Sequence, residues 1–184
     1  MPPAELIPAD EAHAARLGDL HVACWREAYE GLMPAEYLSN LDATKRSNVW
    51  LKIIKGLGSR DGLYLAKVDD AFVGFISFGA WRGAELVNAG EIFAIYLLKA
   101  WQGTGIGKLM LDASLKQMSQ HGFNNVGLWV LDSNSTAIKF YKRQGGSEAG
   151  VSHSISIGGT ELVEVLVTFS SAVAPIPATD HRGC

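Results

Sequence analysis

A glycine-rich stretch, Gln102-Gly-Thr-Gly-Ile-Gly107, separates two segments of different periodicity. Residues 92–98 before it form an apolar run of strand length, rich in β-branched and aromatic residues. After it, apolar residues recur at steps of three and four, which predicts a helix ending near His121. The first turn of a helix has backbone N–H groups without intrahelical partners and carries partial positive charge. Because glycines also let a ligand approach the backbone, the stretch predicts a phosphate-binding turn.

Two common nucleotide-binding patterns do not fit this turn. The dinucleotide fingerprint G-x-G-x-x-G, started at Gly103, places Lys108 at its last glycine. Started at Gly105, it places Met110 there. The P-loop pattern requires Ser or Thr after its lysine, and this chain has Leu109 at that position. A turn that merely joins the strand to the helix is the alternative to a phosphate site.

The spacing that fits is Gln-x-x-Gly-x-Gly, formed by Gln102, Gly105 and Gly107. It resembles the pyrophosphate-binding motif of the Gcn5-related N-acetyltransferases, which hold acetyl-coenzyme A. For Lys108 two roles stay open, a charge-assisted contact to phosphate or a solvated position on the helix. The resemblance implies that the pyrophosphate is bound by Gln102, Gly103, Thr104, Gly105, Ile106, Gly107 and Lys108.

A second segment, residues 131–145, resembles a later motif of the same family. In that motif a strand ends in asparagine, and the next helix carries alanine, a Phe-Tyr pair and glycine. The resemblance implies that Tyr141 protonates the leaving thiolate, whereas an amphipathic helix alone would make it a core aromatic. Asn134 is expected to bind the pantetheine arm or to cap the helix, and Asp132 or Ser133 are further candidate caps. The residues that match the motif are Asn134, Ala137, Phe140, Tyr141 and Gly145.

The family resemblance also implies that two neighbouring parallel strands, residues 91–98 and 126–131, splay apart. The pantetheine arm is itself an amide chain and can pair with an open strand edge like an added strand. By resemblance, the backbone groups of Ile95, Tyr96 and Leu97 make these bonds. One N–H group is expected to face the thioester carbonyl and to stabilise its developing oxyanion.

Glu91 is the candidate catalytic base. An amine must be neutral to attack a thioester, so a base has to take its proton. The position of Glu91 relative to Gln102 is similar to that of the catalytic glutamate in the family's histone-modifying branch. Glu91 would act directly or through a water molecule, and the alternative is a surface carboxylate at the start of a strand.

The acceptor side is less defined by the sequence. The family's variable first helices usually form the acceptor pocket, and the candidate pocket residues there are Trp25 and Tyr29. The run Trp-Arg-Glu-Ala-Tyr-Glu-Gly-Leu-Met-Pro, residues 25–34, resembles a branch that acts on small molecules. Its acidic residues could hold a polyamine-like cation or form a solvated helix face. His121 and His153 are expected to be bystanders.

The order of the expected elements is a strand, three helices and then β-β-β-α-β-α-β-β. This order predicts an α/β (α+β) fold with a mixed, mostly antiparallel sheet, splayed at the cofactor site and flanked by helices. Residues 1–169 are expected to form one acetyltransferase-like domain, and residues 170–184 a flexible tail. The chain departs from the family pattern at Gly146, where relatives usually have a core phenylalanine.

Composition excludes several other classes of protein. The 184 residues suit one domain, and 48% hydrophobic with 19% charged residues is an ordinary globular composition. A net charge of −3 offers no electrostatic case for nucleic acid or for an anionic membrane. Cys24 and Cys184 suggest no disulfide framework and suit a reducing cytoplasm. We find no metal-ligand spacing, no signal peptide and no apolar run of membrane-spanning length.

The resulting expectation is an acetyl-coenzyme A-dependent N-acetyltransferase that acts on the primary amine of a small molecule by direct attack in a ternary complex. One alternative is a peptide or protein amine as acceptor, which needs an open groove instead of a closed pocket. Another alternative, of a different class, is a non-catalytic acyl-coenzyme A sensor. A homodimer is plausible because a late hairpin is expected to be exposed.

Overall fold

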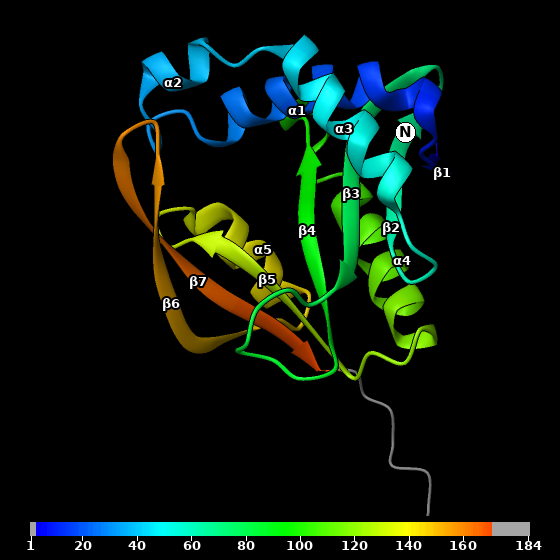
Figure 1. Ribbon diagram of the computed structural model, residues 1–184, viewed down its shortest axis with the longest axis vertical. Coiled ribbons are helices and arrows are strands. Elements are labelled where there is room, and N and C mark those ends of the chain that lie inside the picture. Colours follow the sequence, from blue (N-terminus) through cyan, green and yellow to red (C-terminus); the bar gives the residue numbers. More distant parts are fainter. Residues whose placement is uncertain (1–2, 171–184) are drawn as a thin grey trace, which may run out of the picture.

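A mixed sheet forms the centre of the computed structural model, which describes residues 3–170, and helices cover both of its faces (Figure 1). The strands are β1 (Ala4–Pro8), β2 (Gly62–Val68), β3 (Ala71–Ala80), β4 (Ala89–Leu97), β5 (Asn125–Leu131), β6 (Ser147–Ile157) and β7 (Thr160–Ser170). The α-helices are α1 (Ala14–Ala28), α2 (Ala35–Ser39), α3 (Ala43–Gly56), α4 (Ile106–Gln120) and α5 (Ser135–Arg143). Short 3-10 helices are η1 (Glu11–His13) and η2 (Lys99–Trp101).

The strand order is β1-β2-β3-β4-β5-β7-β6. Neighbouring strands pair antiparallel except β4 and β5, which are parallel and joined through α4. The expected α/β fold with a mixed, mostly antiparallel sheet is therefore confirmed. The strands β1 and β6 form its two edges, and whether β6 pairs with a second copy of the chain stays a prediction.

Alternation along the strands builds two cores, one on each face of the sheet. Ile76, Phe78 and Ile92 pack with α4 and α5, in a cluster that includes Met110, Leu111 and Tyr141. Leu63, Leu65 and Phe75 point to the other face and pack against α1 and α3 through Leu17, Leu20 and Trp50. The two faces thus divide the helices into an α4–α5 side and an α1–α3 side.

The caps of the helices follow local sequence with one correction. Asp42 caps α3 through a bond from the Lys45 amide to its side chain. At α5 the cap is Asn134, whose side-chain oxygen accepts from the Ala137 amide at 3.1 Å. The expectation of Asp132 or Ser133 is wrong, because the Asp132 amide still donates to the carbonyl of Val163 and keeps this residue beside β7.

Tight turns join β2 to β3 and β6 to β7 as hairpins. Asp69 adopts a φ of +50° in the β2–β3 turn, and Gly158 and Gly159 adopt φ of +60° and +78° between β6 and β7. Ser170, expected to begin the tail, ends β7, and residues 171–184 lie outside the described part of the chain. In residues 3–170 we find no helix with the length and hydropathy that crossing a membrane requires.

Candidate active site

The glycine-rich turn follows η2 and leads directly into α4. Gly103 and Gly105 have φ of +77° and +92°, in the left-handed region that side chains with a Cβ rarely adopt. A Cβ added at either position would have no heavy atom within 4 Å, so backbone conformation and not crowding selects glycine there. The space outside the turn is therefore open to a ligand. Beside it, a surface pocket of about 270 Å³ is lined in part by Thr104, Gly105 and Ile106.

Polar side chains of the turn are bonded to its own backbone. Gln102 donates through Nε2 to the carbonyl of Leu97 at 3.2 Å, and Thr104 donates through its hydroxyl to the carbonyl of Trp101 at 2.6 Å. These bonds fix the conformation of the turn. The first amides of α4 stay available for an anion because they have no intrahelical partner. Lys108 forms an exposed ion pair with Asp112 at 2.6 Å, so a phosphate contact from Lys108 would require this pair to open.

The strands β4 and β5 separate soon after they meet. In the described chain their register runs from Ala89 opposite Asn125 to Glu91 opposite Gly127 and goes no further. Beyond this point β4 continues its pairing with β3 as far as Leu97, and β5 continues with β7 as far as Leu131. Figure 1 shows the resulting angle between β4 and β5. The backbone edge of Ile95, Tyr96 and Leu97 that faces β5 consequently has no ladder partner, which is the geometry an extended amide chain requires.

Tyr141 of α5 lies at this opening and is buried, with 7% of its surface exposed. Its ring meets those of Phe140 and Phe169 edge to face, at centroid distances of 5.3 and 6.4 Å. Burial, and then the neighbouring Tyr29, raise the pKa of the Tyr141 phenol well above its ordinary value. Tyr141 is therefore a protonated donor at neutral pH. A Cβ at Gly146 would lie 2.9 Å from the Phe169 ring, so this ring leaves no space for a larger residue at position 146.

Three tyrosines from distant parts of the chain meet at the opening. Tyr29, at the end of α1, and Tyr96 of β4 share a hydrogen bond between their hydroxyls at 2.9 Å. Burial raises the pKa of Tyr96 well above its ordinary value, with further contributions from Tyr29 and Tyr141. Trp25 packs edge to face on Tyr29 at 5.1 Å. The structure thus brings the candidate acceptor residues Trp25 and Tyr29 against the cofactor strand through the Tyr96 side chain, which the sequence analysis had considered for its backbone alone.

Glu91 is 4% exposed, so the alternative of a surface carboxylate is wrong. Both of its oxygens accept hydrogen bonds from Arg82: Oε1 from Nη2 at 2.6 Å, and Oε2 from Nε and the backbone amide at 3.1 Å each. These hydrogen bonds raise the pKa of the Arg82 guanidinium, which also lies 4.2 Å over the ring of Phe93. To act as a base, Glu91 must therefore accept a proton on a carboxylate oxygen that already accepts a hydrogen bond from Arg82. The sequence analysis missed Arg82, because it lies in the loop between β3 and β4 and no spacing links it to Glu91.

Helix α2 packs against the β6–β7 hairpin near Trp25 and Tyr29. Backbone at the hairpin tip approaches Tyr37, since a Cβ at Gly158 would lie 2.9 Å from that ring. Met33, Leu38 and Leu131 are the buried centre of this contact. Figure 1 shows the tip of the hairpin beside α2.

Trp81, Trp129, His153 and Glu164 form a further group, which we name the β-face cluster. His153 lies 3.1 Å from Glu164 through Nε2 and Oε2, and its ring centroid is 4.1 Å from that of Trp129. Trp81 is 6.1 Å from Trp129. The expectation that His153 is a bystander to the reaction stays a prediction.

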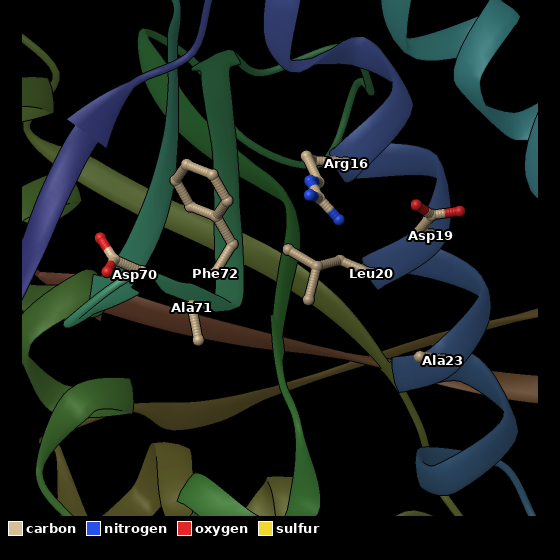
Figure 2. Close-up of a pocket in the computed structure, with 7 residues that line it drawn as sticks. All are labelled: Arg16, Asp19, Leu20, Ala23, Asp70, Ala71 and Phe72. Atoms are coloured by element: carbon tan, nitrogen blue, oxygen red, sulfur yellow. The ribbon is translucent and has the colours of Figure 1, made fainter.

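A larger surface pocket, of about 320 Å³, lies between α1 and the β2–β3 turn (Figure 2). Arg16 and Asp19 project from α1 on one side, and Asp70 and Phe72 stand on the other. None of the residues predicted for the site lines this pocket, and we assign it no part in the reaction.

Comparisons with known proteins agree with this geometry. Residues 15–146 match the model of the acetyltransferase (GNAT) family. The chain is 31% identical over 150 residues to the uncharacterized N-acetyltransferase YuaI of Bacillus subtilis (strain 168), which covers 81% of this chain and 83% of that protein. It is 28% identical over 124 residues to the spermidine N(1)-acetyltransferase of Thermoplasma acidophilum, which covers 66% of this chain and 74% of that protein.

A solved structure shares the fold. The PaiA N-acetyltransferase of Thermoplasma acidophilum, in complex with coenzyme A, superposes with a TM-score of 0.73 at 20% identity. The superposition covers 91% of this chain and 99% of that one. The chain therefore belongs to the GNAT family of acetyltransferases and is an acetyl-coenzyme A-dependent N-acetyltransferase.

Proposed function

We propose that this protein transfers the acetyl group of acetyl-coenzyme A to the primary amine of a small molecule, by direct attack in a ternary complex. The observation that supports the proposal is the apolar packing of α2 and the β6–β7 hairpin around Met33, Leu38 and Leu131, a cluster that also includes the candidate acceptor residues Trp25 and Tyr29. A polypeptide acceptor needs an open groove in which an extended chain can lie. We propose that this packing bounds the acceptor site, which favours a compact acceptor instead.

The cofactor would lie in two parts of the site. The open turn from Gln102 to Lys108 and the first amides of α4 suit the pyrophosphate. The free backbone edge of Ile95, Tyr96 and Leu97 suits the pantetheine arm, with one amide directed at the thioester oxygen. Asn134 already caps α5 through Oδ1, and a bond to pantetheine would add to this role.

The reaction forms a C–N bond and breaks a C–S bond. The amine nitrogen attacks the thioester carbon, the oxyanion is held by a β4 amide, and the thiolate leaves. Tyr141 gives its proton to the departing sulfur; its raised pKa keeps the phenol protonated until then. The proton lost by the amine goes to Glu91, directly or through water, once Arg82 yields one of its bonds to the carboxylate.

The test is thiol release from acetyl-coenzyme A with a panel of polyamines, aminoglycosides, amino acids and peptides. Polyamines are included because one similar protein is named a spermidine acetyltransferase. We expect turnover with one class of small amine and a fall in kcat of about 100-fold in Tyr141→Phe, within the range for loss of a general acid. Tyr64→Phe is the matched control, because its hydroxyl bonds to Gln117 of α4 and not to the opening.

Other results would contradict the proposal in different ways. Turnover with peptides alone would exclude the small-molecule acceptor. Saturable binding of acetyl-coenzyme A without turnover across the panel would favour a sensor. An equal fall in kcat in Tyr141→Phe and Tyr64→Phe would remove the assigned role of Tyr141.

A further inference from the structure

The β-face cluster lies on the same face of the sheet as the acceptor-side helices. On β5, Val126, Leu128 and Val130 belong to the core beneath α4 and α5, so Trp129 and Leu131 point to the opposite face. Leu131 meets Met33 and Leu38 there. The β-face cluster and the residues that pack with α2 therefore lie next to one another on this face of the sheet.

The strand register places residues of β6 and β7 on the same face of the sheet as Trp129 and Leu131. Val165 and Val167 of β7 point into the α4–α5 core, which directs Glu164 to the other face. His153 of β6 pairs directly with Glu164, and Glu164 pairs directly with Leu131 of β5. Because β4 and β5 part after Gly127, Leu131 and Glu164 lie at the wide end of the opening.

Glu164 is a half-buried carboxylate whose charge reaches the tyrosines. Its side chain is 23% exposed, and its ion-pair partner in residues 3–170 is His153, with no lysine or arginine. The pKa of Tyr29 is raised, first by burial and also by the negative charge of Glu164, although its bond to Tyr96 acts the other way. The charge of Glu164 thus acts on Tyr29, whose hydroxyl is bonded to that of Tyr96 on β4.

Glu91, in contrast, already has a cationic partner. Glu91 holds the Arg82 guanidinium through both oxygens. Glu164 has no lysine or arginine partner in residues 3–170, and its contact is with the His153 imidazole at 3.1 Å. A carboxylate without a guanidinium or ammonium partner can accept a charge-assisted hydrogen bond from a cationic ligand.

Aromatic faces lie beside this charge. The rings of Trp129 and His153 are in contact, and Trp81 extends the aromatic surface from the β3–β4 loop, where its Nε1 donates to Glu85 at 3.3 Å. A carboxylate beside indole rings is a recognised arrangement for binding an ammonium group.

We infer that Glu164 binds a second positive charge on the acceptor, so that the acceptor class is a diamine or polyamine. This inference rests on the proposed function. The distal ammonium lies between the Glu164 carboxylate and the indoles of Trp129 and Trp81, and the reacting amine extends past Tyr29 and Tyr96 to the thioester on β4. His153 is a positioning residue, which holds the carboxylate of Glu164 from the opposite strand.

The test compares Glu164→Gln with wild type, using diamines and monoamines of the same length: 1,4-diaminobutane with butylamine, and 1,3-diaminopropane with propylamine. The variant keeps a side chain that can bond to His153 and loses the charge. We expect KM for the diamines to rise about tenfold or more, as for the loss of a charge-assisted contact, with kcat within about twofold. Values for the monoamines should stay unchanged, so that the preference for diamines disappears.

Glu161→Gln is the control, since Glu161 lies on the same strand and pairs with Ser156 away from His153. His153→Gln should raise KM for the diamines with little change in kcat. If Glu164→Gln lowers kcat/KM equally for diamines and monoamines, or changes neither, Glu164 is a structural partner of the hairpin and the inference is wrong.

A binding measurement separates this inference from the proposed function. Calorimetric titration of 1,4-diaminobutane into wild type saturated with coenzyme A requires no turnover. Binding that is lost in Glu164→Gln supports the inference even if no amine is acetylated, in which case the proposed function fails alone. Absence of diamine binding to wild type, together with turnover of monoamines, overturns the inference and leaves the proposed function intact.

Discussion

The cofactor half and the acceptor half of this site are built in different ways. On the cofactor side, the turn from Gln102 to Gly107 and the edge of β4 offer backbone groups, and these come from one continuous stretch of chain. On the acceptor side the candidate groups belong to side chains: Tyr29 from the end of α1, Arg82 from a loop and Glu164 from β7. A site made of backbone groups can therefore be recognised from a short sequence motif. A site made of side chains from several elements depends on the tertiary structure of the whole sheet.

A buried histidine, His21, packs against the aromatic residues of the acceptor half. His21 of α1 is buried, and within residues 3–170 neither ring nitrogen has a hydrogen-bond partner. Its ring lies 5.0 Å from that of Trp25 and 5.7 Å from that of Tyr96. Burial, followed by the nearby Arg46, lowers the pKa of His21 to about 3. The imidazole is therefore neutral at physiological pH and supports the acceptor side as an aromatic packing residue.

The largest effect is expected at Glu91, where the two halves meet. Glu91→Gln removes the candidate base and should lower kcat by about 100-fold, with little change in the affinity for acetyl-coenzyme A. The measurement is steady-state turnover combined with cofactor titration. Glu148→Gln, which breaks an exposed pair with Lys142, is the control. A kcat within about threefold of wild type would show that Glu91 serves as the partner of Arg82 and not as the base.

A second prediction concerns the support of the acceptor half by His21. Because the pKa of His21 is lowered in the folded state, the unfolded state binds the proton more readily below about pH 6.5. This group should therefore reduce the free energy of unfolding as pH falls from about 6.5 towards about 3, by roughly 1.4 kcal/mol per unit. At pH 5 this amounts to about 2 kcal/mol relative to pH 7.

Comparing His21→Phe with wild type isolates this contribution, because the other titrating groups are shared. Urea unfolding at pH 7 and pH 5 should show a smaller loss of stability in the variant. An equal loss in the two proteins would mean that His21 is not neutral and buried at pH 5.

The smallest expected effect tests the cofactor half. Alanine at Gly105, where φ is +92°, should reduce the free energy of unfolding by about 1 kcal/mol and weaken coenzyme A binding several-fold. Gly150→Ala is matched to it, because Gly150 has a φ of +71° and equally open surroundings but lies on β6. It should lose similar stability and no affinity. If both variants bind coenzyme A like wild type, the turn does not form the pyrophosphate site.

Local patterns predicted most of the elements correctly. The Asp69-Asp70 turn, the Gly158-Gly159 hairpin and the cap of α3 at Asp42 depend on residues within a few positions of one another. At α5 the candidate cap Asn134 is confirmed, and the further candidates Asp132 and Ser133 are wrong. The Asp132 amide bonds to Val163, a residue distant in the sequence, and no local pattern shows this bond. For the same reason Phe169 could not be foreseen as the ring that fills the space beside Gly146.

The sequence by itself indicated the family and the fold class and predicted a phosphate-binding turn, because glycines at this spacing before an amphipathic helix form a recognisable local pattern. Three contacts were visible only in the tertiary structure. They are the hydrogen bonds from Arg82 to Glu91, between the hydroxyls of Tyr29 and Tyr96, and between His153 and Glu164. Each of these contacts joins side chains from separate elements. Strand order and register set such contacts, and they follow from how the two cores pack and not from any short run of residues.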